Sequence, residues 1–120
     1  MVAKQEFGSF QELLSTSEVP LVVDFYAPWC GPCQLMASIL EQVNDEMKQQ
    51  IKIVKINVDN YPDLASQYQV HALPTIVVFK QGQPVKRIEG VVKSQQLVQQ
   101  LQAIVGVAES RYELSDSPSP

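Results

Sequence analysis

Hydrophobic residues follow helical and strand-like spacings in alternation along the chain. Segment 9–16 is amphipathic, and Ser9 followed by Glu12 is typical of a capping box that opens a helix. The almost unbroken apolar run LVVDFYA at 21–27 predicts a central strand that is buried on both faces. Apolar residues then return at helical spacing up to about residue 48, at Leu35, Met36, Ile39, Leu40, Val43 and Met47.

The second half of the chain continues this alternation. β-Branched residues at 51–59 predict a second core strand, and Pro62 predicts the start of a short helix. A buried strand is expected at 75–80, followed by a turn at Gly82 and a strand that Pro84 assigns to a sheet edge. A last helix is expected from Ser94 to Gly106. This order predicts an α/β domain in which helices flank a central mixed β-sheet on both faces.

The two ends of the chain differ from this pattern. Residues 109–120 are polar and end in alternating Ser and Pro, so we expect a disordered tail after a domain spanning 1–108. The N-terminal residues lack the apolar segment of a signal peptide and the bias of a transit peptide. No window is long enough to span a bilayer. We therefore expect a soluble protein that is made where it works or is already processed.

Composition and charge narrow the functional classes. Of the 120 residues, 45% are hydrophobic and 18% charged, as expected for one globular domain. The formal net charge is −4 and the basic residues are scattered, which argues against binding of nucleic acid. The chain has two cysteines, which suits a reducing compartment where cysteines serve chemistry rather than crosslinking.

Both cysteines lie in the segment APWCGPCQ, where only Gly31 and Pro32 separate Cys30 from Cys33. A structural disulfide over so short a loop would stabilise the fold little. A structural zinc needs about four ligands, and the only histidine is His71. A metal cluster shared between two chains and a pair of inert buried thiols are further alternatives.

A redox couple accounts for more of the pattern than these alternatives do. The pair lies where a strand ends and an amphipathic helix begins, and free N–H groups at a helix N-terminus favour a thiolate. Pro32 is tolerated there because the first helical turn has no N–H hydrogen bond to lose. The placement predicts Cys30 as the exposed nucleophile and Cys33, one turn inward, as the shielded cysteine that reacts second.

The order of motifs resembles the thioredoxin family from about residue 6 to residue 106. The matching residues are Asp24, Trp29, the Cys30–Cys33 pair, Leu73-Pro74-Thr75 and Gly90. Gln34, with NYP and ALPT, is most similar to the y-type thioredoxins of chloroplasts and cyanobacteria. The cysteine pair of thioredoxins is itself a standard example of thiol activation in a Cys-X-X-Cys motif. The resemblance implies the thioredoxin fold and a protein-disulfide reductase that uses a Cys30–Cys33 redox disulfide in electron transport and cell redox homeostasis.

The resemblance also implies the partners of the protein. These are a thioredoxin reductase, linked to ferredoxin or NADPH, and disulfide-containing targets such as peroxiredoxins. We expect a monomer with no cofactor, metal, nucleic acid or membrane partner, in the cytoplasm of a bacterium, cyanobacteria included, rather than in the mature plastid stroma. Two other interpretations are a disulfide oxidase or isomerase of the same fold, whose relatives usually carry a histidine between the cysteines, and a non-catalytic thioredoxin-like interaction module.

Asp24 is the residue least expected from its surroundings. A carboxylate inside a buried strand is unfavourable, so its pKa should be raised, whereas an aspartate that reaches solvent would be ordinary. The resemblance implies that Asp24 transfers the Cys33 proton and that Lys55 is its partner. Taken alone, Lys55 is better interpreted as a surface lysine.

Further site residues come from the resemblance. It implies that Pro74 follows a cis peptide bond, although X–Pro bonds are trans by default. It adds Gly31 and Pro32 to the catalytic set. It also implies that the backbone of Ala72 and Leu73 pairs with an extended target peptide.

Five more positions are expected to contact targets or to bear on target choice. Trp29 is expected to cover the thiols at the surface, the alternative being a core aromatic. Gly90, with Val91, is expected where a target chain approaches closely, the alternative being an ordinary bulge. His71 is interpreted as incidental. Two residues depart from the family pattern: Gln34 removes a positive charge after Cys33, and Glu89 adds a negative one, which bears on docking rather than on dithiol chemistry.

Overall fold

The computed structural model describes the backbone of residues 7–116 and the side chains of residues 9–106. It contains one four-stranded sheet in the order β2-β1-β3-β4. β1 pairs in parallel with β2 and antiparallel with β3, which pairs antiparallel with β4, so the sheet is mixed as predicted. The strands are β1 (Leu21–Tyr26), β2 (Lys52–Asn57), β3 (Thr75–Lys80) and β4 (Gln83–Glu89).

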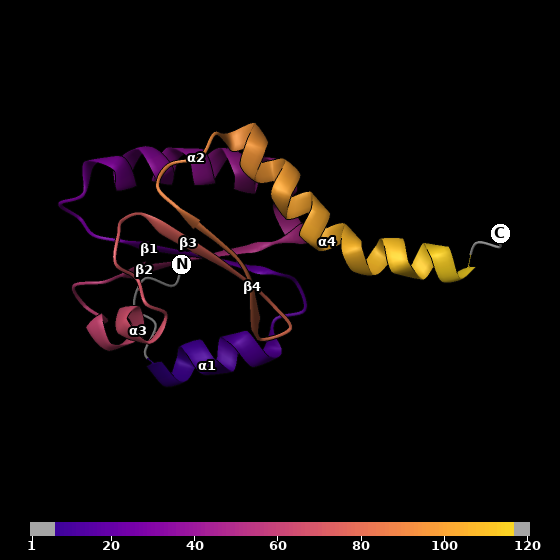
Figure 1. The fold of residues 1–120 in the computed structure, drawn as a ribbon, viewed down its shortest axis with the longest axis horizontal. Helices are drawn as coiled ribbons and strands as arrows, with labels where there is room; N and C mark the ends of the chain where they lie inside the picture. The colour runs from indigo at the N-terminus through magenta and orange to yellow at the C-terminus, as the bar shows by residue number, and fades with distance from the viewer. Residues whose placement is uncertain (1–6, 117–120) are drawn as a thin grey trace.

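Helices cover both faces of the sheet, which confirms the predicted fold class (Figure 1). On one face lie α2 (Gly31–Met47) and α4 (Ser94–Asp116), and on the other lie α1 (Phe7–Thr16) and α3 (Pro62–Gln67). The short 3-10 helix η1 (Lys48–Gln50) leads from α2 toward β2. Each face of the sheet therefore has its own apolar core.

β1 contributes to both cores because successive side chains of a strand point to opposite faces. All residues from Leu21 to Phe25 are buried. Val22 packs with the α2 and α4 side chains, whereas Val23 and Phe25 pack with those of α1 and α3. By the same alternation, Asp24 lies on the face of β1 that α2 covers.

The last two strands form the predicted hairpin. Gln81 and Gly82 make the turn with positive φ values of 55° and 80°. Pro84 lies in β4, the outermost strand of the sheet, where the missing N–H group of proline removes no internal ladder bond. The glycine and proline signals in the sequence therefore located both the turn and the sheet edge.

Two predictions about the first two helices are wrong in detail. α1 begins at Phe7, so Ser9 lies inside the first turn rather than at the N-cap. Leu35 does not join the buried stripe of α2 and is 56% exposed. The buried positions recur every three or four residues and leave Leu35 on the solvent side; they are Cys33, Met36, Leu40, Val43 and Met47.

The last helix also differs from its prediction. α4 does not end at Gly106 but continues to Asp116, over part of the segment expected as a tail. A single glycine inside a helix costs only about 1 kcal/mol relative to alanine, and no proline occurs between the start of α4 at Ser94 and Pro118. The boundary at residue 108 stays a prediction, and residues 1–6 and 117–120 lie outside the described part. Within residues 7–116, no helix is long and apolar enough to cross a bilayer.

Candidate functional site

The two cysteines lie at the point where β1 leads into α2. Cys30 is the N-cap residue of α2, and its Sγ accepts a hydrogen bond from the backbone N–H of Cys33 at 3.2 Å. A disulfide joins the two residues, with their Cα atoms 5.2 Å apart. Pro32 occupies the first helical turn, as predicted. Because N–H groups at a helix N-terminus stabilise negative charge, this geometry favours a thiolate on Cys30 after reduction.

Both cysteines are buried, with 6% of Cys30 and 3% of Cys33 exposed. The predicted exposure of Cys30 is therefore wrong for the disulfide form. The reason is packing, since the pair clusters with Ala27 and with the partly buried Val58 and Leu73. Cys30 nevertheless lines a surface groove, which Cys33 does not. The two cysteines differ in their access to this groove rather than in exposed area.

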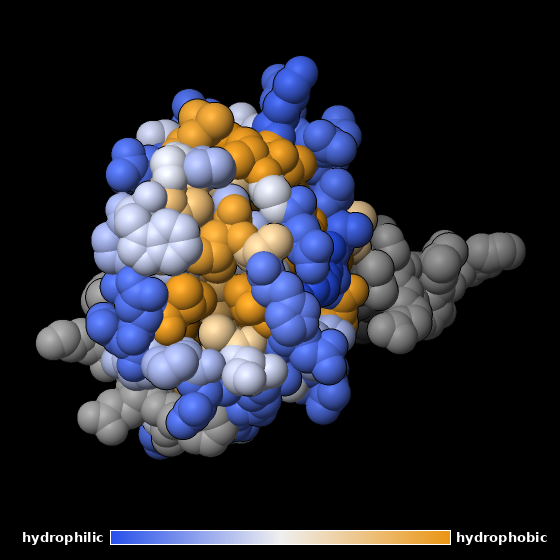
Figure 2. Space-filling model, turned by 60° about the vertical axis from the view of Figure 1, so that its left-hand side comes forward, coloured by the Kyte–Doolittle hydropathy of each residue, from blue (hydrophilic) through white to orange (hydrophobic). Residues whose placement is uncertain are grey.

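The groove beside Cys30 has a volume of about 540 Å³. It lies between the β1–α2 turn, the residue that follows β2, and the loop that precedes β3. Its lining residues are Trp29, Cys30, Gly31, Pro32, Val58, Val70, His71 and Leu73. Figure 2, in which the β1–α2 side of the molecule comes forward, shows apolar side chains gathered at the centre of this face with hydrophilic ones around them.

Trp29 is 71% exposed, so it is not a core aromatic. Its indole Nε1 donates a hydrogen bond to Oδ2 of Asp59 at 3.0 Å, which fixes one edge of the ring at the groove. The sequence analysis missed Asp59. Its signal was an aspartate two residues after the end of β2, because the carboxyl ends of the parallel strands β1 and β2 meet at the same end of the sheet.

The loop from residue 70 to residue 74 forms the other wall of the groove. The Leu73–Pro74 peptide bond is cis, as the resemblance implied. Leu73 lines the groove together with Cys30, whereas Ala72 is exposed outside its lining. The Thr75 hydroxyl donates to the Ala72 carbonyl, and the Pro74 carbonyl accepts the Gly90 N–H at 2.9 Å. The Leu73-Pro74-Thr75 motif contains Thr75, but the sequence does not predict its hydrogen bond to the loop.

Gly90 and Val91 lie beyond the end of β4 and outside the groove lining. Gly90 has a φ of 89°, a backbone conformation that side chains disfavour, and a Cβ added there would meet nothing within 4 Å. Backbone conformation, rather than crowding, explains this glycine in the described structure. Val91 is 42% exposed and offers an apolar contact next to it.

Asp24 is fully buried, and neither of its carboxyl oxygens has a hydrogen-bond partner among the described residues. Burial raises the pKa of Asp24 from 3.8 to about 6, and the positive charge of Lys55 partly opposes this rise. The prediction of a buried aspartate with a raised pKa is confirmed.

Lys55 lies opposite Asp24 in the β1–β2 register. Within the described side chains no ion pair joins the two residues, and the Lys55 ammonium lies 5.0 Å from the centroid of the Tyr26 ring. Lys55 therefore acts on Asp24 through its field rather than by contact.

Residues 1–103 match the family model described as Thioredoxin. The chain belongs to the thioredoxin family. It is 58% identical over 105 residues to a thioredoxin-like protein of Synechocystis sp., an alignment that covers 88% of this chain and 100% of that protein. It is 49% identical over 105 residues to the chloroplastic Thioredoxin Y of Oryza sativa, covering 88% of this chain and 62% of the relative. The y-type resemblance is thus confirmed, although the chain spans less than two thirds of the chloroplastic Y relatives.

Solved structures give the same assignment. Mitochondrial thioredoxin 3 of Saccharomyces cerevisiae superposes with a TM-score of 0.77 at 32% identity, covering 85% of this chain and 93% of that one. A chain with the same TM-score and 31% identity, covering 85% and 93%, comes from a structure on thiol resolution in the yeast mitochondrial 1-Cys peroxiredoxin via glutathione and thioredoxin systems. As a thioredoxin with a Cys30–Cys33 redox pair, the protein is a protein-disulfide reductase that works by dithiol–disulfide exchange.

The raised pKa of Asp24 predicts how stability depends on pH. Between about pH 4 and pH 6 the folded protein binds more protons than the unfolded chain, so its stability falls as pH rises through this window. Asp24→Asn removes the ionisation and should raise the free energy of unfolding by roughly 2–3 kcal/mol at pH 8, but by only about half of that at pH 5. Urea unfolding of both proteins at the two pH values measures the difference.

Asp45→Asn is the matched control, because Asp45 is an exposed aspartate of α2. It should change the unfolding free energy little at either pH. A gain for Asp24→Asn that is absent, or equal at pH 5 and pH 8, would show that burial does not control the Asp24 pKa.

Proposed function

We propose that Cys30 is the attacking cysteine and Cys33 the resolving one. The supporting observation is that Cys30 alone of the two lines the groove, while its sulfur accepts the Cys33 N–H at the start of α2. The Cys30 thiolate attacks one sulfur of a target disulfide, forms a mixed disulfide and expels the other target sulfur as a thiolate. Cys33, once deprotonated, attacks the Cys30 sulfur and releases the second target thiolate. The target gains two electrons, and the Cys30–Cys33 disulfide is restored.

Asp24 serves in this proposal as the acceptor of the Cys33 proton. It lies on the face of β1 that α2 covers, and Tyr26, two residues further on the same face, packs against the cysteine cluster. With a pKa of about 6, its carboxyl group is largely ionised at neutral pH and can accept a proton. The nearby charge of Lys55 favours the ionised form.

The groove is the proposed binding site for an extended target segment. Trp29 and Leu73 offer apolar contacts on either side of Cys30. No backbone hydrogen bond joins Leu73 to another described residue, so its peptide groups are available for pairing with a target strand. Ala72, Gly90 and Val91 extend this surface, and Gly31 and Pro32 line it at the start of α2.

The proposed electron donor is a thioredoxin reductase linked to ferredoxin or NADPH, and the proposed targets include peroxiredoxins. The similarity to the chain from the yeast peroxiredoxin structure supports such targets. The proposed location is the bacterial cytoplasm, supported by the relative from Synechocystis, and the proposed state is a monomer. A non-catalytic module and a disulfide oxidase or isomerase of the same fold are the competing interpretations that experiments must separate.

Reduction of insulin by dithiothreitol tests catalysis. The wild-type protein should accelerate the reaction well above the uncatalysed rate, whereas Cys30→Ser should give only the background because the attacking thiolate is missing. Equal rates for the two proteins would favour a non-catalytic module. A redox titration against glutathione should give a reducing potential, and a potential as oxidising as that of the disulfide oxidases would reverse the direction of the proposed reaction.

Trapping tests the order of the two cysteines. Cys33→Ser should still attack targets but lack the resolving thiol, so mixed disulfides through Cys30 should accumulate. Non-reducing electrophoresis after incubation with a disulfide-containing peroxiredoxin measures these complexes. Cys30→Ser is the matched control and should trap little. Equal trapping through either cysteine would contradict the assigned order.

Single-turnover kinetics test the role of Asp24. Asp24→Asn should slow release of the reduced target about tenfold or more and leave the first attack by Cys30 within about twofold, because only the second step needs the Cys33 proton removed. Rapid acid quench with an insulin substrate follows the mixed disulfide. Asp45→Asn should leave both steps unchanged. Equal slowing of both steps by Asp24→Asn would remove Asp24 from the proton-transfer step.

A further inference from the structure

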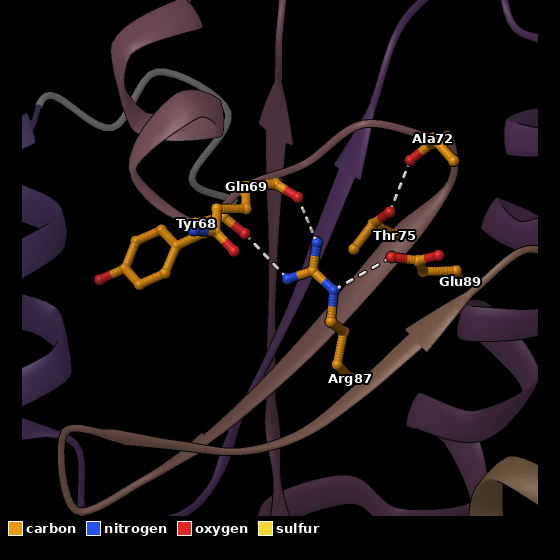
Figure 3. A network of polar contacts seen from close by, with 6 residues as sticks. All are labelled: Tyr68, Gln69, Ala72, Thr75, Arg87 and Glu89. Atoms are coloured by element: carbon orange, nitrogen blue, oxygen red, sulfur yellow. Dashed lines mark hydrogen bonds and ion pairs between the residues drawn. The ribbon is translucent and has the colours of Figure 1, made fainter.

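Arg87, on the edge strand β4, makes three polar contacts that the proposed mechanism does not use (Figure 3). Its Nη1 donates to the Tyr68 carbonyl at 2.8 Å, and its Nη2 donates to the Gln69 carbonyl. Its Nε forms an ion pair with Oε2 of Glu89 at 3.1 Å. One guanidinium therefore joins β4 to a segment almost twenty residues earlier in the chain.

The two carbonyls lie at the end of α3, where the backbone turns sharply. The Gln69 N–H binds the Ser66 carbonyl and the Val70 N–H binds the Ala65 carbonyl, which is the pattern of a Schellman motif. Gln69 occupies its left-handed position with a φ of 55°, a conformation that glycine adopts more easily than glutamine. The hydrogen bonds from Arg87 hold the two carbonyls that this turn leaves outside the helix.

Tyr68 gives this attachment a rigid base. Its partly buried ring packs against the core on the α1 side, with its centroid 5.3 Å from that of Phe79 and 6.1 Å from that of Phe10, both edge to face. The backbone of Tyr68 is therefore fixed on one side by aromatic packing and on the other by Arg87. The chain enters the groove loop, residues 70–74, from this fixed point.

The edge strand β4 and the residue that follows it hold the groove loop at both ends. Arg87 binds the two residues directly before the loop, and the N–H of Gly90, three residues further along the chain, binds the carbonyl of its last residue, Pro74. The Thr75 hydroxyl braces the interior of the loop at Ala72, as Figure 3 shows. Five residues between two fixed ends have little freedom to move.

We propose that Arg87 is a positioning residue for target recognition, which keeps the groove loop in the conformation that binds an extended target segment. The inference rests on the proposed function of this loop. A loop that is already ordered loses less conformational entropy when a target pairs with it, so Arg87 lowers the KM for protein targets without taking part in thiol chemistry. Glu89 orients the guanidinium from the same strand. Glu89, the acid that departs from the family pattern, thus pairs with Arg87 in the structure.

The geometry requires arginine rather than any cation. A guanidinium donates in several fixed directions, which matches two carbonyls and one carboxylate around the same group. A lysine ammonium at the end of a flexible chain can satisfy part of this set. We therefore expect a graded series, with Arg87→Lys between the wild type and Arg87→Met.

Kinetics with two substrates of different size test the proposal. For Arg87→Met, the KM for insulin should rise about fivefold or more with kcat within about twofold. Its rate with the small disulfide 5,5′-dithiobis(2-nitrobenzoate) should stay within about twofold of the wild-type rate. Its redox potential should equal that of the wild type, because Cys30 and α2 are not altered. Arg87→Lys should give a smaller rise in KM. Lys86→Met is the matched control, since no side-chain hydrogen bond joins Lys86 to another described residue, and its KM should equal that of the wild type.

The outcomes separate this inference from the proposed function. An insulin KM for Arg87→Met equal to that of the wild type, or an equal loss with both substrates, would overturn the positioning role. A lower urea midpoint with unchanged kinetics would assign Arg87 to stability alone and overturn it as well. If Arg87→Met does not fold, Arg87→Lys and Glu89→Gln replace it. An insulin KM that equals the wild-type value in both of these variants would also overturn the positioning role. A wild type no faster than Cys30→Ser would instead refute the proposed function itself.

Discussion

The burial of β1 on both faces is the constraint on which the rest of the structure depends. A strand with apolar side chains in both directions is stable only if helices cover both faces of its sheet, and here α2 and α4 cover one face and α1 and α3 the other. Because α2 follows β1 after a short turn, its N-terminus must lie at the carboxyl end of the central strand. The cysteines occupy that junction, so their electrostatic environment is set by the sheet and helix together rather than by local sequence alone.

The same strand contains the least favourable residue of the core. Asp24 is fully buried and its carboxyl oxygens have no hydrogen-bond partner among the described residues, so an apolar residue there would avoid the cost of burying a polar group, yet the strand retains a carboxyl group with a pKa of about 6. Buried ionisable groups with shifted pKa values gather at working sites because catalysis requires a group that exchanges protons near neutral pH. Stability and proton transfer thus make opposite demands on one position, as is common in functional sites.

Features that depend on neighbouring residues could be predicted from the sequence, and features that depend on distant ones could not. The apolar run of β1, Pro32 in the first turn of α2 and the glycine of the hairpin each act locally. In contrast, the buried state of Cys30 depends on Val58 and Leu73 from other segments, and the partner of Trp29 lies 30 residues away. The cis bond before Pro74 followed only from family resemblance, since its local sequence favours trans. The end of α4 was misplaced because glycine weakens a helix without necessarily ending it.

Trp29 gives the molecule a built-in optical reporter. It is the single tryptophan of the chain and is largely exposed. Its ring N–H donates a hydrogen bond to Asp59 at the rim of the groove. Indole emission depends strongly on polarity and on nearby quenching groups. Light emitted after selective indole excitation therefore originates beside Cys30, whereas the four tyrosines are excited only at shorter wavelengths. Changes in the spectrum on reduction or on docking of a tryptophan-free partner would report on the groove directly, with no label attached.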